Sequence, residues 1–195
     1  MIDTKARPLH AGQFVGFSIP VAARTALLFN SLAVTAVAIA ALLPLAVLLY
    51  WTVTDAGHLV RSIGLAPDIL TEIGTMNRVG AALITVLTVL PLSWGLVRLR
   101  VCFIEFANGR PFAARGVAGL RDFATGVTLA AIAKPVGFTL LILALSWNAP
   151  PGMRQLAIQI DSDTLIMALF AATVASLGWA MEKAAVIAEE NSQFV

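Results

Sequence analysis

Four long apolar stretches divide the chain at regular intervals, over about residues 27–51, 79–97, 127–147 and 165–181. Each is close to the roughly 20 residues with which an α-helix crosses a hydrocarbon layer of about 30 Å. Of the 195 residues, 59% are hydrophobic and 12% are charged, whereas soluble domains average roughly 45–50% and 25%. Little of the chain therefore remains for a soluble domain. The sequence predicts an all-α integral membrane four-helix bundle that forms one domain over residues 1–195.

The basic residues predict how the four spans are oriented, because Lys and Arg accumulate in the cytoplasmic loops of membrane proteins. Nine of them precede the first span, follow the last, or lie between the second and third spans. Three lie in the other two loops, one of which is the long loop 52–78. We therefore expect both termini in the cytoplasm and loop 52–78 outside. Tryptophans near the span ends fit the membrane interfaces: Trp51, Trp94, Trp147 and Trp179.

Small residues predict where the spans approach each other, since close backbone contact drives helix association in lipid. The third span carries such a stripe from Gly126 to Gly137, and the fourth carries one from Ala168 to Ala180. We expect these two faces to pack together as an antiparallel hairpin. In the outer loop, Ala66-Pro67-Asp68 predicts the start of a short surface helix, which either caps the bundle or presents a surface for a partner.

Residues 98–122 predict a helix, a break and a second helix on the cytoplasmic side. Gly109 suits the end of the first helix, because glycine adopts a left-handed conformation without a side-chain clash. Pro111 suits the first turn of the second helix. Phe112 is then expected to point back toward the bundle.

Five arginines surround this break, and two interpretations of them remain open. They hold anionic lipid headgroups, at about 1 kcal/mol per cation near the surface, or they form a docking surface for a cytoplasmic protein. Direct nucleic-acid binding is not expected, because no aromatic interleaving or recognition motif accompanies the basic residues. The candidate binding residues of this surface are Arg98, Arg100, Arg110, Phe112, Arg115 and Arg121.

Lys134 is the one charged residue inside a predicted span. If the span begins near Val127, Lys134 lies about 10 Å from the cytoplasmic edge, and its stem can extend to that interface. No carboxylate lies at matching depth in any span, so Asp122 and Glu182 at the inner boundary are the nearest candidate partners. An intramembrane charge is otherwise a functional-site hypothesis. Lys134 therefore either snorkels or caps a helix, or it contacts a ligand or a proton.

The sequence lacks the residues that catalysis in a membrane would need. The serines in the spans have no histidine in any span to activate them, and the outer carboxylates lack the histidines of a catalytic metal site. One cysteine and two histidines do not form a familiar zinc pattern. We expect a protein that is not an enzyme and binds no metal or other cofactor.

Two short motifs are similar to those of the DUF2975 family of bacterial four-span membrane proteins. The first is Phe106 with Gly109-Arg110-Pro111-Phe112, followed by Leu120-Arg121 and a third span that carries glycines. The second is Ala188-Glu189-Glu190-Asn191 with Phe194-Val195 behind it. The resemblance covers about residues 25–195. The polar N-terminal segment and Lys134 are not assigned to the family pattern.

The resemblance implies a location in the bacterial inner membrane and supplies no catalytic residues. Some members of the family are encoded beside small helix-turn-helix regulators, which implies a cytoplasmic protein partner such as a transcriptional regulator. The function expected from the sequence is therefore partner binding through the cytoplasmic face. The alternative is a small oligomeric transporter or channel subunit, a homo-oligomer in which Lys134 contacts an anionic solute.

Overall fold

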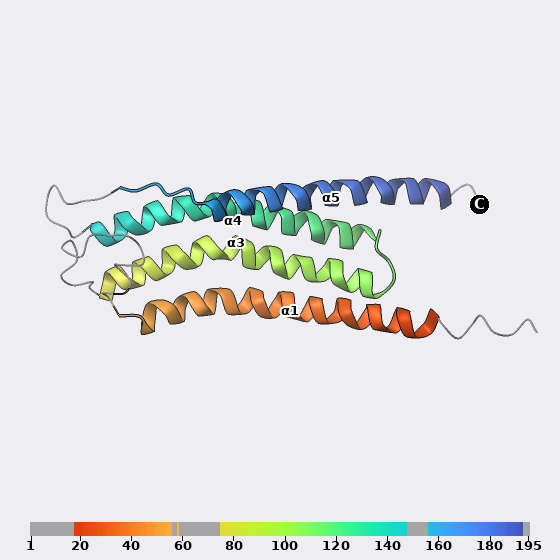
Figure 1. Cartoon of the computed structure of the whole chain (residues 1–195), viewed down its shortest axis with the longest axis horizontal. Helices are drawn as coiled ribbons and strands as arrows, with labels where there is room; N and C mark the ends of the chain where they lie inside the picture. The colour runs from red at the N-terminus through yellow and green to blue at the C-terminus, as the bar shows by residue number, and fades with distance from the viewer. Residues whose placement is uncertain (1–17, 56–57, 59–74, 148–155, 193–195) are drawn as a thin grey trace, which may run out of the picture.

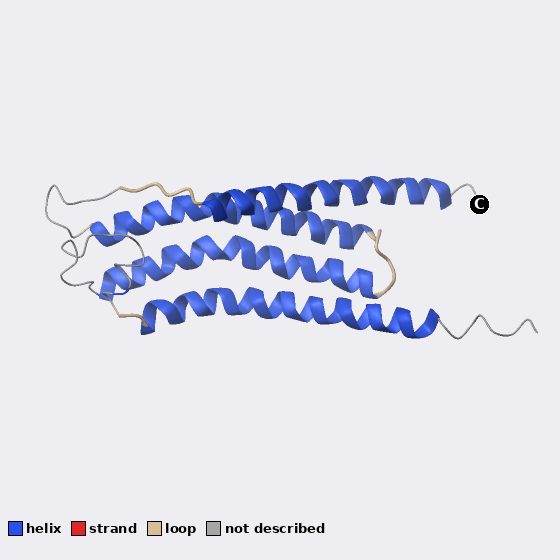
Figure 2. Cartoon of the chain, viewed as in Figure 1, coloured by secondary structure: helices blue, strands red, loops and turns tan. Residues whose placement is uncertain are grey.

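Four long helices make up nearly all of the computed structural model, which describes residues 18–55, 58, 75–147 and 156–192. They are α1 (Ser18–Val53), α3 (Thr75–Ala107), α4 (Ala114–Ser146) and α5 (Ser162–Ser192). Each contains one of the four predicted spans and extends it at both ends, apart from the last residue of the third, and each is long and apolar enough to cross a membrane. Figure 2 shows helices and loops, without strands, in the described part of the chain. The expected surface helix near Pro67 lies outside the described residues.

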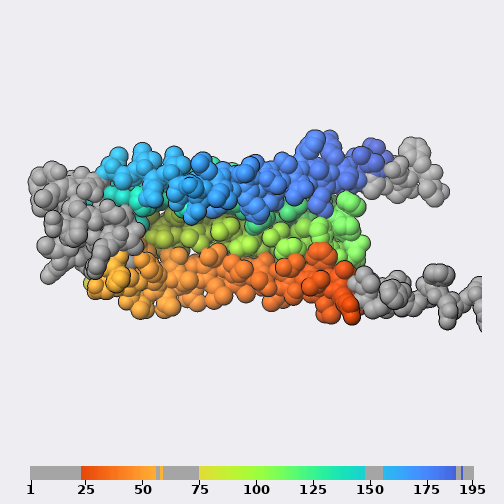
Figure 3. All heavy atoms as spheres, in the orientation of Figure 1, coloured from red at the N-terminus to blue at the C-terminus, as the bar shows by residue number. Residues whose placement is uncertain are grey.

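The helices pack in chain order, α1 on α3, α3 on α4, and α4 on α5. Within the described residues, α1 and α5 share no comparable contact. The bundle is therefore open along one side, and Figure 3 shows α3 exposed between α1 and α5. The start of α1, the connection from α3 to α4 and the end of α5 share one end of the bundle (Figure 1), which we call the turn end. We call the opposite end the loop end.

Glycines bring α3 and α4 into backbone contact. A Cβ atom added at Gly126 would lie 2.8 Å from Gly95 Cα and 2.7 Å from the Pro91 carbonyl oxygen. One added at Gly119 would lie 2.7 Å from the Arg98 carbonyl oxygen. Distances this short leave no room for a side chain, so glycine is required where these two helices touch.

The third and fourth spans do pack as an antiparallel pair, α4 on α5, but the expectation that they meet through the two small-residue stripes is wrong. Gly126 and Gly137 of the α4 stripe face α3, where a Cβ atom at Gly137 would collide with Thr88. The α5 stripe from Ala168 to Ala180 is exposed. α5 instead packs on α4 through larger side chains as well as alanines. Its buried residues, Ala171 and Val174, lie on a face of the helix next to the stripe. The buried residues of this contact are Phe123, Ala124, Val127, Ala171 and Val174.

A second apolar cluster lies nearer the loop end and joins α1, α3 and α4. It consists of Trp51, Ala81, Ile142 and Leu145, all of which are buried. The Trp51 indole N–H donates a hydrogen bond to Thr85 Oγ1 at 3.2 Å, so its polar atom is satisfied inside the cluster. This contact fixes the end of α1 against α3.

Residues Leu156–Asp161, which we call the strap, run in an extended conformation beside α4 before α5 begins (Figure 1). Apolar residues alternate along the strap, as is typical of extended chain. The side chains of Leu156, Ile158 and Ile160 are exposed, whereas Ala157 packs against the cluster around Trp51. α5 therefore starts about halfway along α4 and extends beyond it at the turn end (Figure 1).

Candidate functional site

The connection from α3 to α4 closes with the hydrogen bonds of a Schellman motif. The Arg110 N–H donates to the Glu105 carbonyl oxygen at 2.9 Å, and the Gly109 N–H donates to the Phe106 carbonyl oxygen at 3.0 Å. Gly109 has a φ of 71°, which glycine adopts at no steric cost. The predicted helix end at Gly109 is confirmed.

The sequence predicted Pro111 in the first turn of the next helix, and this prediction is wrong. Ala113 is extended, with φ −61° and ψ 132°, and α4 begins at Ala114. The Gly116 and Val117 N–H groups donate to the Ala113 carbonyl oxygen at 2.9 and 3.1 Å. Pro111 and Phe112 therefore belong to the turn itself.

Two of the five arginines at the turn end are paired within the chain. Arg98 donates from Nε to Asp122 Oδ2 at 2.6 Å and so joins α3 to α4. Arg110 Nη2 lies 2.8 Å from Oε2 of Glu105, whose side chain is nearly buried, in an ion pair without the alignment of a hydrogen bond. These two cations are therefore neutralised locally, and they hold the turn in place.

The other three arginines, Arg100, Arg115 and Arg121, are exposed and form no ion pair within the described residues. Arg121 lies on α4 beside the last turns of α5, where a groove of about 510 Å³ opens between the two helices. Phe112 is 49% exposed and borders this groove. The structure thus brings Phe112 and Arg121 together with Glu182, and it leaves Arg100 and Arg115 outside the groove. The turn-end groove is lined by Phe112, Val117, Arg121, Glu182, Ala185 and Val186, with Ala114 and Ala118.

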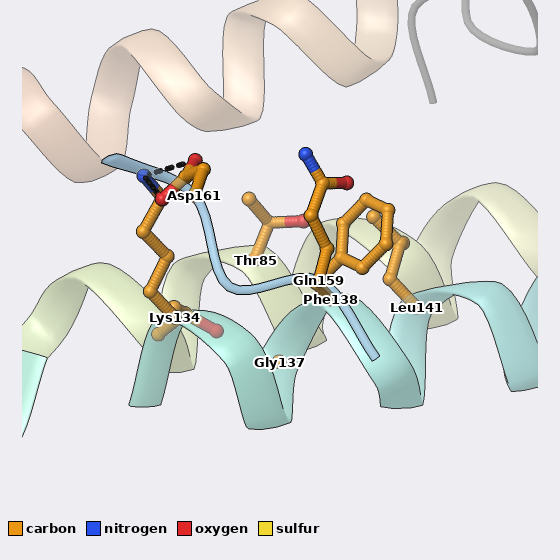
Figure 4. Close-up of a pocket in the computed structure, with 8 residues that line it drawn as sticks. Thr85, Lys134, Gly137, Phe138, Leu141, Gln159 and Asp161 are labelled. Carbon is orange, nitrogen blue, oxygen red and sulfur yellow. Dashed lines mark hydrogen bonds and ion pairs between the residues drawn. The ribbon is translucent and has the colours of Figure 1, made fainter. Parts of the chain in front are cut away.

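Lys134 is paired with Asp161 of the strap, a partner that the sequence did not suggest. Lys134 Nζ donates to both carboxylate oxygens of Asp161, at 2.8 and 3.0 Å (Figure 4), and lies 3.8 Å from Asp163 Oδ2. Neither expected partner is used, since Asp122 pairs with Arg98 and no ion pair joins Lys134 to Glu182. By its position in the sequence, Asp161 belongs to the loop between the third and fourth spans and not to the depth of Lys134, so the predicted span ends give no sign of this pair.

Asp161 also begins α5. Its Oδ1 accepts hydrogen bonds from the Thr164 N–H at 2.9 Å and from the Thr164 hydroxyl at 2.6 Å. This is the arrangement of an N-cap, in which a side-chain oxygen satisfies a free N–H of the first turn. One carboxylate therefore starts α5 and ties it to the middle of α4. An aspartate three residues before Thr164, after an alternating apolar segment, was the signal available in the sequence.

An open cleft of about 310 Å³ lies beside this ion pair, between α3, α4 and the strap (Figure 4). Thr139 attaches the strap to α4, because its hydroxyl donates a hydrogen bond to the Ala157 carbonyl oxygen at 3.1 Å. The charged groups of Lys134 and Asp161 lie toward one end of the cleft, and the Phe138 ring and Leu141 lie toward the other, beside Gln159 (Figure 4). The residues that line the cleft are Thr85, Thr88, Lys134, Gly137, Phe138, Leu141, Gln159 and Asp161.

Among the described residues, no group of three or more His, Cys, Asp or Glu side chains is placed so that it could hold a metal ion. Comparisons with protein-family models, curated proteins and solved structures found no match to this chain. The resemblance to DUF2975 therefore stays a prediction, and the functional argument depends on the turn-end groove and the cleft beside Lys134.

Proposed function

We propose that this chain is a non-enzymatic protein of the bacterial inner membrane that binds a cytoplasmic protein through its turn end. Four helices of spanning length support insertion in a membrane, and the nine basic residues on one side support cytoplasmic termini. In that orientation the turn end faces the cytoplasm, together with Arg100, Arg115 and Arg121.

The turn-end groove is the observation that carries this proposal. Val117 is buried at its floor, and Phe112 and Val186 are half-exposed at its rim. A groove between two helices accepts the apolar face of an amphipathic helix, a recurring mode of peptide recognition. The unneutralised arginines nearby favour a partner helix that also carries acidic residues.

Anionic lipid headgroups are the second ligand that these arginines fit. Arg100 and Arg115 are exposed and lie outside the groove, so they are free to contact headgroups while the groove is occupied. Each contributes about 1 kcal/mol of attraction near an anionic surface. The groove then selects the protein, and the surrounding arginines contact the lipid.

The test is crosslinking at the turn end in the native membrane, with a photoreactive residue at Phe112 of the tagged full-length chain. We expect one stoichiometric cytoplasmic protein, and we expect Arg121→Glu together with Val186→Asp to remove it. Arg78→Glu is the matched control, because Arg78 lies near the start of α3 at the loop end. Recovery of the same proteins from the groove variant and the control would contradict the proposal, as would the absence of any crosslinked protein.

The alternative expected from the sequence, an anionic solute bound by Lys134, has no specific observation in its favour. The Lys134 ammonium already donates to both oxygens of Asp161, so an anion has to displace a carboxylate that is also held by α5. The transporter or channel interpretation stays a prediction.

A further inference from the structure

We propose that a second groove between α4 and α5 binds one membrane phospholipid whose headgroup carries both a phosphate and a primary ammonium, as in phosphatidylethanolamine. This groove, which we call the Trp179 groove, has a volume of about 300 Å³. It shares Arg121 and Glu182 with the turn-end groove and extends from them toward the middle of the bundle. The inference rests on the membrane insertion proposed above and not on the cytoplasmic protein partner.

Two opposite charges border the Trp179 groove, and neither is neutralised within the described part of the chain. Arg121 lies on α4 and Glu182 lies on α5, and they are the two charged residues of the lining. Among the described residues, no ion pair joins them to each other or to any other side chain. A bound group with one negative and one positive charge therefore satisfies both, with its negative end at Arg121 and its positive end at Glu182.

The lining of the groove changes from charged to apolar where the sequence places the membrane interface. Arg121 and Glu182 lie just outside the third and fourth predicted spans. Leu129, Ala175 and Trp179 lie inside those spans. Leu129 is eight residues along α4 from Arg121, or about 12 Å deeper in the bundle. A phospholipid carries its charged headgroup and its apolar chains in this same order, so the groove matches it in polarity as well as in charge.

The inner part of the groove offers contacts to an acyl chain. Leu129 is 48% exposed and Trp179 is 64% exposed, and the buried Ala124 also lines the groove. Tryptophan is typical of the boundary between headgroups and chains, which is the level that Trp179 occupies in this arrangement. The groove therefore holds the headgroup and the upper part of one chain, while the rest of the lipid lies in the bilayer.

The two charges also distinguish between phospholipid headgroups. A headgroup that carries only the phosphate charge, as in phosphatidylglycerol, pairs with Arg121 and brings its negative charge close to Glu182. The choline group of phosphatidylcholine is positive, but it has no N–H group with which to donate a hydrogen bond to the Glu182 carboxylate. The aminoethyl headgroup of phosphatidylethanolamine pairs at both ends. Because both side chains are exposed, the preference is modest, about threefold.

Lipids with brominated acyl chains test this inference in the full-length protein reconstituted in bilayers, because bromine quenches the fluorescence of a tryptophan that the chain contacts. Trp179 is kept as the single tryptophan, and the other three are changed to phenylalanine. Brominated phosphatidylethanolamine, phosphatidylglycerol and phosphatidylcholine with identical chains each compete with unbrominated phosphatidylcholine. We expect the first to bind beside Trp179 about threefold more tightly than either of the others.

A protein that keeps only Trp94 is the matched control. Trp94 borders a groove between α1 and α3 whose lining contains no charged residue, so the three brominated lipids should quench it equally. Helix content by circular dichroism establishes that each variant is folded.

Charge variants of the protein that keeps only Trp179 separate the two ends of the headgroup. Glu182→Gln removes the partner of the ammonium, so phosphatidylethanolamine should lose its advantage over phosphatidylglycerol. Arg121→Gln removes the partner of the phosphate and should weaken the binding of all three lipids. Lys183→Gln is the control for Glu182, because Lys183 is its charged neighbour and does not line the groove; this variant should keep the preference.

Equal quenching of Trp179 by the three lipids, a preference for phosphatidylglycerol or phosphatidylcholine, or the same preference at Trp94 would overturn the proposal. A preference for phosphatidylethanolamine that survives Glu182→Gln would overturn it as well. None of these measurements involves the crosslinked cytoplasmic protein, so the lipid site and the protein partner fail separately.

Discussion

The Lys134 ammonium on α4 and the Asp161 carboxylate at the start of α5 form a two-oxygen ion pair across 27 positions of sequence. Lys134 lies 12 residues from Asp122 and 12 residues from Ser146, or about 18 Å of helix in each direction. The charge is therefore in the middle of the longest apolar part of α4. It is neutralised there by a residue that reaches it only because the strap returns along the helix.

The ion pair is expected to couple the two residues in a double-mutant cycle. Lys134→Met, Asp161→Asn and the double variant should show a favourable coupling, a modest one because both side chains are about one-third exposed. Thermal unfolding in detergent, followed by helix content, measures it. Asp161→Ala should destabilise the chain more than Asp161→Asn, because asparagine retains the cap. Additive effects of the two single changes would contradict the pairing.

Close contact between α3 and α4 makes Gly126 intolerant of a side chain. Gly126→Ala places a Cβ atom 2.8 Å from Gly95 Cα and 2.7 Å from the Pro91 oxygen, so it should cost about 1–3 kcal/mol of unfolding free energy. Gly80→Ala is the matched control, since nothing lies within 4 Å of its added Cβ. It should be neutral or stabilising by up to about 1 kcal/mol. Equal midpoints of thermal unfolding for the two variants would count against this helix contact.

The positive φ at Gly109 predicts a penalty for any side chain there. Gly109→Ala should destabilise the chain by about 1–2 kcal/mol, because its Cβ approaches the following carbonyl oxygen in the left-handed conformation. Gly109→Asn should cost less, since asparagine tolerates this conformation better. Chemical unfolding of both variants beside the unmodified protein makes the comparison, and an alanine variant as stable as the asparagine variant would be the opposing result.

The hydroxyl of Thr85 is expected to stabilise the end of α1 through Trp51. Thr85→Val leaves the indole N–H of the buried Trp51 without its acceptor and should cost about 1–3 kcal/mol. Thr85→Ser keeps the acceptor and should cost clearly less. The emission maximum of Trp51, measured with the other three tryptophans changed to phenylalanine, should shift in the valine variant alone.

The position of the strap can be tested by disulfide formation after Cys102 is changed to alanine. Thr139→Cys with Ala157→Cys should crosslink, because the Thr139 hydroxyl and the Ala157 carbonyl oxygen are 3.1 Å apart. Thr139→Cys with Ile158→Cys should not, since the Ile158 side chain is exposed rather than packed on α4. Similar oxidation rates for the two pairs would show that the strap does not lie as described.

The four helices were predictable because hydrophobic runs of spanning length are a strong signal, and so was the helix end at Gly109. The helix that packs on the α4 glycines could not be predicted. A stripe of small residues shows that a face is close-packed, but it does not show which helix packs there. Asp161 was missed for a related reason. The predicted ends of the spans put Asp161 outside the membrane. The strap returns along α4 and so carries Asp161 to the depth of Lys134.

α5 begins at the ion pair and ends beside the turn-end groove, so one straight element joins the two candidate sites. Its 31 residues make a rod about 46 Å long, and the hydrogen bonds along its axis resist stretching. Any sliding of its first turn against Lys134 therefore displaces Glu182 and Val186 by nearly the same distance.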